Sequence, residues 1–284
     1  MNRLLVKNSF YLLLTFFFFS CSNKGSSGGG GVTPPPPPPP AVYDWVFETT
    51  PVWTDEFSTD GAPDANKWGY DIGGSGWGNN ELQYYTDGLN ATINSGILKI
   101  TARKENYSGK TYTSARMITK NKADWLYGSF EIKARLPKGR GTWPAIWMLP
   151  TESAYGVWPN SGEIDIMEHV GYNLNTVHFT LHATAFFGAN GKGSSRFITT
   201  VTDDFHIYRL DWTPYGIRGF FDNEKVFEYI NPNSGFSSWP YDKKFHLLLN
   251  VAVGGNWGGA QGVDDTVFPA TLEIDHVKVY KFVR

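Results

Sequence analysis

Ser161-Gly162-Glu163-Ile164-Asp165-Ile166-Met167-Glu168-His169-Val170 is the stretch that decides how this chain folds. Side chains of a β-strand alternate between its two faces, so Glu163 and Asp165 share one face while the two isoleucines point to the other. Strict alternation would put Glu168 on the apolar face, where an ionised carboxylate is very costly. One β-bulge near Met167 would reset the alternation, so we predict a bulged strand with all three carboxylates on one face.

A row of like charges on one strand indicates that the carboxylates have a catalytic role. Crowded carboxylates destabilise a fold and push their pKa values apart, so a chain that builds such a row is expected to use it. The fitting use is a glycosidase pair, in which one ionised carboxylate is the nucleophile and one protonated carboxyl is the acid. Retaining glycosidases place these groups roughly 5–5.5 Å apart, a separation that two glutamates on one strand face can approach. The alternative is a solvated strand face whose acids take no part in catalysis.

Further motifs accompany the acidic strand in collinear order. They are Trp77-Gly78-Asn79-Asn80-Glu81-Leu82-Gln83-Tyr84-Tyr85-Thr86, Tyr127-Gly128-Ser129-Phe130-Glu131, Leu136-Pro137-Lys138-Gly139, Gly141-Thr142-Trp143-Pro144-Ala145-Ile146-Trp147-Met148-Leu149-Pro150, Asp204-Phe205-His206, Leu249-Asn250-Val251-Ala252-Val253-Gly254-Gly255-Asn256-Trp257 and Asp275-His276-Val277-Lys278-Val279-Tyr280. With the bulged Glu-x-Asp-x-x-Glu stretch, they resemble glycoside hydrolase family 16 from about Trp53 to the C-terminus. The pattern looks most like the bacterial laminarinases, which are endo-1,3-β-glucanases.

The first residues predict export. Residues 1–20 have a positive start at Arg3 and Lys7 and an apolar run too short to span a bilayer, which is typical of a signal peptide. Cys21 is the only cysteine, and it stands where a bacterial lipoprotein signal carries its acylated residue. We therefore expect lipidation at Cys21 and an anchor at the bacterial cell envelope, with the outer membrane as the expected location. The alternative is a secreted protein with a stray cysteine.

Residues 21–42 predict a Gly/Ser/Pro-rich tether. Its glycines and serines form a flexible part, and the seven consecutive prolines Pro34 to Pro40 form a stiff polyproline II spacer. At about 3.1 Å per residue, the proline run spans on the order of 20 Å. Such a tether would hold a domain clear of a membrane surface, although it could also be an ordinary linker.

Residues 43–284 are expected to form one catalytic domain. They contain no cysteine, so an exported domain must rely on its core without disulfides. The net charge of the chain is −2 and no basic run occurs, which argues against a nucleic-acid partner. The chain holds 11 Trp, 15 Tyr and 20 Phe, more than a core alone explains, and Trp beside Gly or Asn suggests platforms for sugar rings. We expect a monomer that acts on a polysaccharide.

Alternating apolar residues predict an all-β fold. The predicted strands are residues 97–103, 130–136, 177–183, 206–212, 219–229 with a hairpin turn at Asp222-Asn223, 245–253 and 272–282. We find no convincing helix. Many antiparallel strands in one domain indicate two sheets packed face to face. The resemblance implies a β-jelly-roll sandwich whose concave sheet forms a substrate cleft, with the acidic strand as its floor.

The resemblance also implies a role for each acid. Glu163 would be the nucleophile, and Glu168 would be the acid that protonates the leaving oxygen and then the base that activates water. Asp165 would lie between them and hydrogen-bond Glu163. Catalysis would then need no cofactor.

Candidate substrate-binding residues surround the acids. Trp143 and Trp158 adjoin loops and could stack on sugar rings, whereas Trp147 fits either the core or such a platform. His182 could contact the acids from the next strand or be an ordinary polar-face histidine. The complete candidate set is Asn80, Arg116, Trp143, Trp147, Trp158, His182, Asn256, Trp257 and Gln261.

A structural calcium ion is implied by the resemblance alone. Family members often hold one on the convex side, away from the cleft, with main-chain oxygens and one Asp. The matching positions are Glu56, Gly96 and Asp275, and oxygen ligands suit calcium. From the sequence itself, Asp275 is only a polar strand residue.

Three functions follow from these observations. The first is a retaining endo-hydrolase of β-1,3-glucan (laminarin-like), with mixed-linkage β-1,3-1,4-glucan as a further candidate substrate. The second is a galactan hydrolase of the agarase, porphyranase or carrageenase type, because the bulged acids are common to those relatives. The third is a non-catalytic glucan-binding module, which would keep the aromatic residues but has no need of three acids on one strand.

Overall fold

The computed structural model describes residues 43–284. The predicted signal peptide, the lipidation site Cys21 and the tether lie outside the described residues. Within residues 43–284, no helix is long and apolar enough to cross a membrane.

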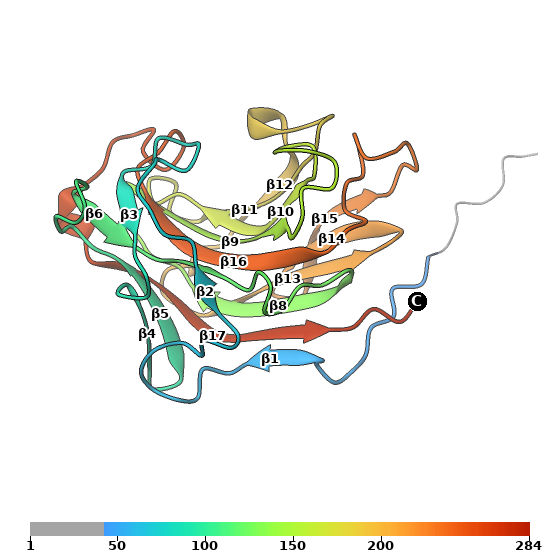
Figure 1. Cartoon of the computed structure of the whole chain (residues 1–284), viewed down its shortest axis with the longest axis horizontal. Helices are drawn as coiled ribbons and strands as arrows, with labels where there is room; N and C mark the ends of the chain where they lie inside the picture. Colours follow the sequence, from blue (N-terminus) through green and yellow to red (C-terminus); the bar gives the residue numbers. More distant parts are fainter. Residues whose placement is uncertain (1–42) are drawn as a thin grey trace, which may run out of the picture. The chain divides into compact units, whose positions relative to one another are not determined.

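Two antiparallel sheets form the domain (Figure 1). The first has the order β15 (Glu224–Ile230), β14 (Gly216–Phe221), β13 (His206–Thr213), β8 (Gly128–Arg135), β17 (Ala270–Tyr280), β5 (Ile97–Ala102) and β4 (Ala91–Asn94), and β1 (Trp53–Asp55) also pairs with β17. The second has the order β12 (Lys192–Phe197), β11 (Thr176–His182), β10 (Glu163–His169), β9 (Thr142–Pro150), β16 (Phe245–Val253), β7 (Arg116–Ile118) and β2 (Gly69–Tyr70). The predicted all-β sandwich is confirmed.

Short elements complete the domain. Two strands, β3 (Gln83–Tyr85) and β6 (Tyr112–Ser114), form a separate parallel pair. The helices within the described residues are two single 3₁₀ turns, η1 (Gly188–Asn190) and η2 (Asp265–Val267). The sheet that contains β10 is curved, and loops rise at both of its margins (Figure 1).

The core is built from the apolar faces that the alternation predicts. In β8, Phe130, Ile132 and Ala134 are fully buried, and β5 contributes its own alternate residues to the same cluster. All nine residues of the predicted strand β16 are buried, as expected for a strand that is covered on both faces. The β14–β15 hairpin turns at Asp222 and Asn223, whose φ angles of 47° and 67° suit a tight hairpin turn.

The strand β10 carries the predicted bulge. Asp165 pairs with Thr180 of β11, and Glu168 pairs with His178, so three steps along β10 (165 to 168) face two steps along β11 (180 to 178). The register between β10 and β9 also shifts, between Asp165 and Met167. The extra residue changes the parity of the strand at the position that the sequence requires.

The bulge places the apolar side chains of β10 on one face and its acidic side chains on the other. Ile164, Ile166 and Met167 are fully buried and belong to the apolar core. Glu163 and Glu168 lie on the opposite face, which lines the cleft. The strand therefore buries consecutive apolar residues without forcing the last glutamate inward.

Deletion of Met167 tests the bulge, because it removes the extra residue and leaves a strand of strict alternation in which Glu168 still faces the cleft. We expect the free energy of unfolding to fall by about 2–5 kcal/mol, since the fully buried Met167 side chain is lost from the core. Urea unfolding followed by circular dichroism measures this change. The control Met167→Leu keeps the chain length and the volume, and should cost less than about 1.5 kcal/mol. Equal stability of the two variants would contradict the role given to the bulge.

Candidate active site

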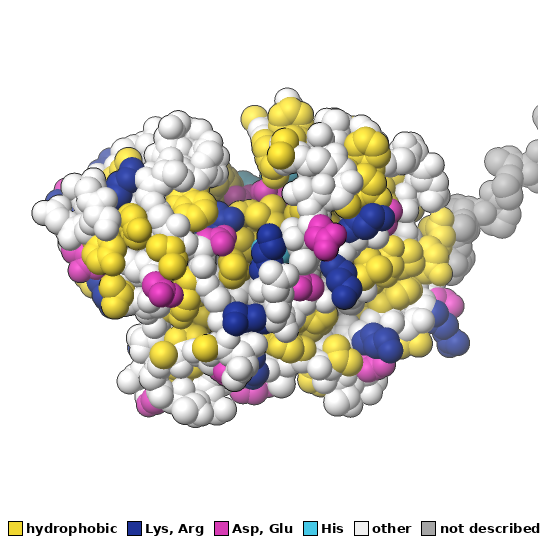
Figure 2. All heavy atoms as spheres, viewed as in Figure 1, with side chains coloured by type: hydrophobic (Ala, Val, Ile, Leu, Met, Phe, Trp, Pro, Cys, Tyr) yellow, Lys and Arg dark blue, Asp and Glu magenta, His cyan; other side chains and the backbone are white. Residues whose placement is uncertain are grey.

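A cleft of about 1040 Å³ lies on the outer face of the sheet that contains β10. Figure 2 shows it as a notch between two raised groups of loops, with acidic side chains and histidine at its floor. The cleft extends from Arg116 on β7, across β9, β10 and β11, to Ser195 on the edge strand β12. A long ligand would therefore lie across the strands.

The three acids meet at the centre of this cleft. Glu163 and Glu168 line its main space, and Asp165 lies beneath, with 2% of its surface exposed. Asp165 is hydrogen-bonded to Glu163, as expected from the resemblance. The arrangement that the sequence predicts for β10 is present.

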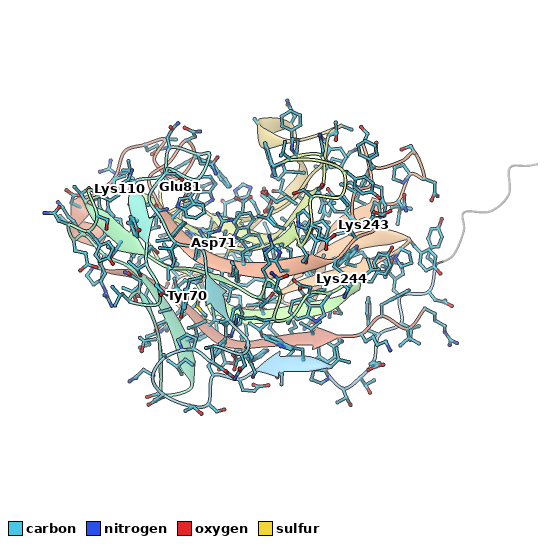
Figure 3. All side chains as sticks on the ribbon, viewed as in Figure 1. Tyr70, Asp71, Glu81, Lys110, Lys243 and Lys244 are labelled. Carbon is cyan, nitrogen blue, oxygen red and sulfur yellow. The ribbon has the colours of Figure 1, made fainter. Side chains whose placement is uncertain are left out.

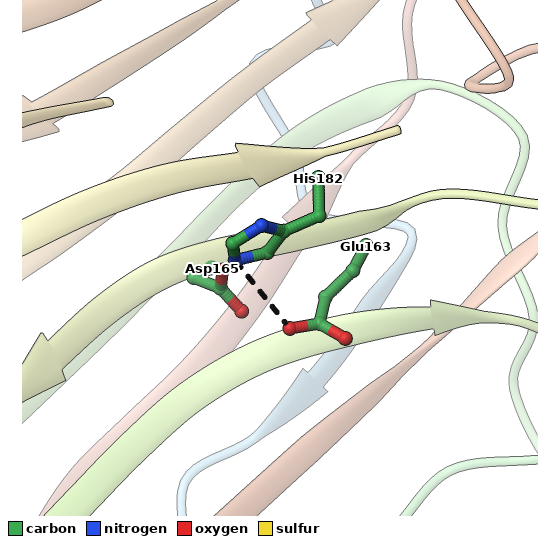
Figure 4. Close-up of side chains that lie close together, drawn as sticks. All are labelled: Glu163, Asp165 and His182. Carbon is green, nitrogen blue, oxygen red and sulfur yellow. Dashed lines mark ion pairs between the residues drawn. The ribbon is translucent and has the colours of Figure 1, made fainter. Parts of the chain in front are cut away.

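His182 reaches the acids from β11. It pairs with Glu163 across the β10–β11 ladder, and its side chain points at both acids (Figure 4). Its Nε2 atom lies 3.2 Å from Asp165 Oδ2 and 3.9 Å from Glu163 Oε1. The sequence left the role of His182 open, and the structure places it against the acids.

Each glutamate is held by an indole. The Nε1–H of Trp158, from the loop between β9 and β10, donates to Glu163 Oε2 at 2.8 Å. The Nε1–H of Trp143, at the start of β9, donates to Glu168 Oε1 at 3.2 Å. The two indoles thus fix carboxylate orientation in addition to offering ring faces to a sugar.

Burial and mutual repulsion favour the protonated forms of the three carboxyl groups on the cleft floor. Burial, followed by the charge of Asp165, raises the pKa of Glu163 to about 8, whereas His182 and the Trp158 hydrogen bond act in the opposite direction. Burial, followed by the charge of Glu163, raises the pKa of Glu168 to about 7. Burial and Glu168 also raise the pKa of Asp165. Because these groups interact, their protons belong to the set, and the floor retains at least one proton at neutral pH.

The two glutamates differ in the hydrogen bonds that they accept. Taken singly, Glu163 has the higher pKa of the two, but it accepts the 2.8 Å indole bond and faces His182. Glu168 accepts a longer indole bond, at 3.2 Å. Donors directed at a carboxylate favour its anion, so these contacts act toward an ionised Glu163, against the order of the two pKa values.

A second group of side chains surrounds Arg116 at one end of the cleft. Its guanidinium carbon lies 4.7 Å from the ring centroids of both Trp77 and Trp147, and its Nε lies 3.0 Å from Asp71 Oδ2. Figure 3 labels Asp71 and Glu81 on this side of the molecule. Trp147 and Arg116 both line the cleft, which answers whether Trp147 belongs to the core or to a platform.

A chain of buried hydrogen bonds orients Trp147. Its Nε1 donates to Asn250 Oδ1 at 2.7 Å, and Asn250 Nδ2 donates to the hydroxyl of Tyr85 at 3.0 Å. The Tyr85 hydroxyl donates to Glu81 Oε2 at 3.2 Å. Burial raises the pKa of Glu81. Sequence reasoning missed Asn250 and Tyr85. Only Asn250 carried a signal, as a polar residue within the mostly apolar strand β16.

The Gly-rich loop between β16 and η2 closes the Glu168 side of the cleft. Trp257 packs edge-on against Trp143, with ring centroids 5.6 Å apart, and against His178, with centroids 5.0 Å apart. Asn256 lines the cleft beside Trp257 and accepts a 2.8 Å hydrogen bond from Asn80. Burial lowers the pKa of His178, which keeps its ring neutral against the indole.

The remaining candidates lie near the cleft without lining it. Asn79 and Gly78 form part of the wall, whereas Asn80 acts through Asn256. Gln261 lies in the same Gly-rich loop but outside the cleft wall. The structure thus gathers most of the predicted residues around the acids and sets these two at the margin.

The three positions of the expected calcium site lie on the other sheet. β5 and β1 pair with the same edge of β17, with Leu98 opposite Ile274 and Asp55 opposite Val277. Residues 275 and 276 fall between these two pairings, where the register of β17 with β8 also shifts. Residues 275 and 276 thus interrupt the pairing along this edge of β17. Gly96 adjoins the interruption from the β5 side, and Glu56 adjoins it from the β1 side.

Comparisons with known proteins identify a family and several similar proteins. Residues 76–277 match the family described as Glycosyl hydrolases family 16. A β-glucanase of Rhodothermus marinus is 53% identical over 245 residues, covering 82% of this chain and 85% of that protein. A glucan endo-1,3-beta-glucosidase of Cryptopygus antarcticus is 41% identical over 255 residues, covering 82% and 91%. The X-ray structure of a laminarinase from Rhodothermus marinus matches with a TM-score of 0.82 at 50% identity, covering 84% of this chain and 100% of that one.

Proposed function

The chain belongs to glycosyl hydrolase family 16, and on that basis we propose that it is a retaining endo-hydrolase of β-1,3-glucan. One observation carries the proposal: Glu163 and Glu168 face the same cleft from one bulged strand, each held by an indole N–H. The cleft crosses the sheet from β7 to the edge strand β12, so a polymer can lie across it and be cut internally.

The first step forms a glycosyl-enzyme. Glu163 attacks the anomeric carbon, while Glu168 gives its proton to the leaving glycosidic oxygen. The Trp158 indole holds one oxygen of Glu163, which leaves Oε1 free to form the bond to carbon. Burial and the charge of Glu163 supply a protonated Glu168 at neutral pH.

The second step releases the sugar. Glu168, now ionised, takes a proton from a water molecule, which attacks the anomeric carbon and breaks its bond to Glu163. His182 and the Trp158 N–H remain against Glu163 and stabilise its returning negative charge through a nearby imidazole and a hydrogen bond. The anomeric configuration is retained because the carbon is inverted twice.

The lining of the cleft favours a neutral glucan. Among the described residues that line it, Arg116 is the only Lys or Arg, and its charge is already matched by Asp71. Trp77, Trp143, Trp147 and Trp158 supply apolar ring faces. A sulfated galactan would need more unpaired cations, so laminarin is the expected substrate and mixed-linkage glucan a further one.

Reducing-sugar assays on laminarin, lichenan and agarose test the function. We expect the protein to cleave laminarin, and we expect Glu163→Gln to reduce the rate by more than about a thousandfold, because the nucleophile is lost. Glu152→Gln is the matched control, since Glu152 is exposed in the loop before β10 and should leave the rate unchanged. Cleavage of agarose alone, or laminarin cleavage that persists in Glu163→Gln, would reject this function or this mechanism.

We also propose a structural calcium ion at the interruption between β5 and β1. The carboxylates of Asp275 and Glu56 lie 3.1 Å and 3.3 Å from the Nζ atoms of Lys133 and Lys278, respectively. The main-chain oxygens of Glu56, Gly96 and Asp275 would therefore be the principal ligands, with the Asp275 carboxylate completing them. Such oxygen donors suit calcium, and the ion would join three strands without touching the cleft.

Thermal unfolding in EDTA and in CaCl₂ tests the calcium site. At a calcium concentration one hundred times Kd, we expect Tm to rise by about 5–10 °C, because binding to the folded state adds about 2.7 kcal/mol. Asp275→Asn should abolish most of this rise, whereas Asp203→Asn, an exposed residue of the turn before β13, should retain it. If the Tm of the unaltered protein is the same in EDTA and in CaCl₂, the proposed calcium site is wrong.

We further propose that the protein is exported and lipid-anchored through Cys21, with the outer membrane as the destination. The proposal is supported by the charged start, the apolar run and the position of the single cysteine. In a bacterial host fed an alkyne-labelled fatty acid, the unaltered protein should carry the label in the membrane fraction. Cys21→Ser should be unlabelled and Ser22→Ala should behave like the unaltered chain. An unlabelled, soluble unaltered protein would point to plain secretion.

A further inference from the structure

Two exposed aromatic rings meet beside the nucleophile. Trp158 and Phe187 retain 50% and 45% exposure, although such large rings are usually well buried. Their centroids lie 5.7 Å apart with the planes at 83°, an edge-to-face contact. Trp158 comes from the loop between β9 and β10, and Phe187 from the loop between β11 and β12.

The half-exposed Trp158 side chain must satisfy two constraints at once. Its N–H must stay 2.8 Å from Glu163 Oε2 while its ring remains open to the cleft. The only other ring contacts within the described part of the chain are with His182, at 6.0 Å between centroids, and with Phe187. Of these two ring contacts, the one with Phe187 is the shorter, and it comes from a loop outside the sheet.

The loop that carries Phe187 is itself well anchored. Ala183 and Phe186 exchange two backbone hydrogen bonds, of 2.7 and 2.9 Å, and the Phe186 ring is buried. The Ala185 N–H donates to the Ser237 carbonyl at 2.9 Å. The Thr184 hydroxyl donates to Asn160 Oδ1 at 3.0 Å, which ties this loop directly to the loop of Trp158.

We propose that Phe187 is a positioning residue for catalysis, which holds the Trp158 indole so that its N–H stays on Glu163 while a sugar occupies the cleft. Phe187 does not itself line the cleft, whereas its neighbours Gly188 and Ala189 do. Its effect on the reaction passes through the indole. The inference rests on the proposed function, because it gives Glu163 the role of nucleophile.

The hydrogen bond predicts a specific pH effect. The charged and titratable groups that face Glu163 are Asp165 and Glu168 on β10, His182 on β11, and Tyr241 from the segment before β16. The indole N–H favours the ionised form of Glu163, so its loss raises the pKa of Glu163. Attack requires the ionised form, and the acid limb of the rate profile therefore moves to higher pH.

The test compares Phe187→Ala with Phe197→Ala. Phe197 is also an exposed phenylalanine, on β12, but it has no contact with Trp158. The value of kcat/KM is measured against pH on an aryl β-laminaribioside, whose good leaving group needs no proton from Glu168. For Phe187→Ala we expect the acid limb at higher pH and a three- to tenfold lower kcat/KM at neutral pH, on the order of a weakened hydrogen bond to a charge. Phe197→Ala should match the unaltered enzyme.

Two further variants keep the test decisive. Phe187→Tyr retains the ring edge and should restore the original acid limb, while Thr184→Val breaks the tie to Asn160 and should shift the limb in the same direction as Phe187→Ala. An acid limb that stays in place in both Phe187→Ala and Thr184→Val overturns the inference, even if kcat/KM falls. An unaltered protein that cleaves neither laminarin nor the aryl glycoside would instead reject the proposed function.

Discussion

The active site depends on one extra residue in a β-strand. Without the bulge between Asp165 and Glu168, a period of two would leave Glu168 among the fully buried Ile164 and Ile166. With the bulge, Ile166 and Met167 both enter the core and the acids stay on the cleft face. The fold can therefore concentrate negative charge at its surface without weakening the core on which that surface rests.

Crowding the acids has a cost that the surrounding side chains offset. Burial raises the pKa of all three carboxyls, and a floor of three bare charges would repel itself. His182 contacts two of them, and an indole N–H reaches each glutamate. The strands thus supply the charge, and the indoles of Trp158 and Trp143 each donate a hydrogen bond to one of the glutamates.

The two ends of the cleft are held in different ways. At the Arg116 end, the guanidinium lies between two indoles, and hydrogen bonds link Trp147 through Asn250 to Tyr85. These contacts restrict the side chains of Arg116 and Trp147. At the other end, Trp158 is supported by an exposed ring from a neighbouring loop. The position of the indole beside Glu163 therefore depends on contacts between loops as well as on the sheet.

The sequence by itself determined strands β5, β8, β10, β11 and β13 to β17 with their apolar faces, the hairpin at Asp222 and the bulge, because these follow from the order of residues within one strand or turn. It also identified the acids, since their spacing is local. Only the tertiary structure decided that His182 touches the acids and that Trp147 lines the cleft. It alone placed Phe187 against Trp158. Such contacts join separate strands and loops, and they depend on register and loop closure, which alternation within a single strand does not specify.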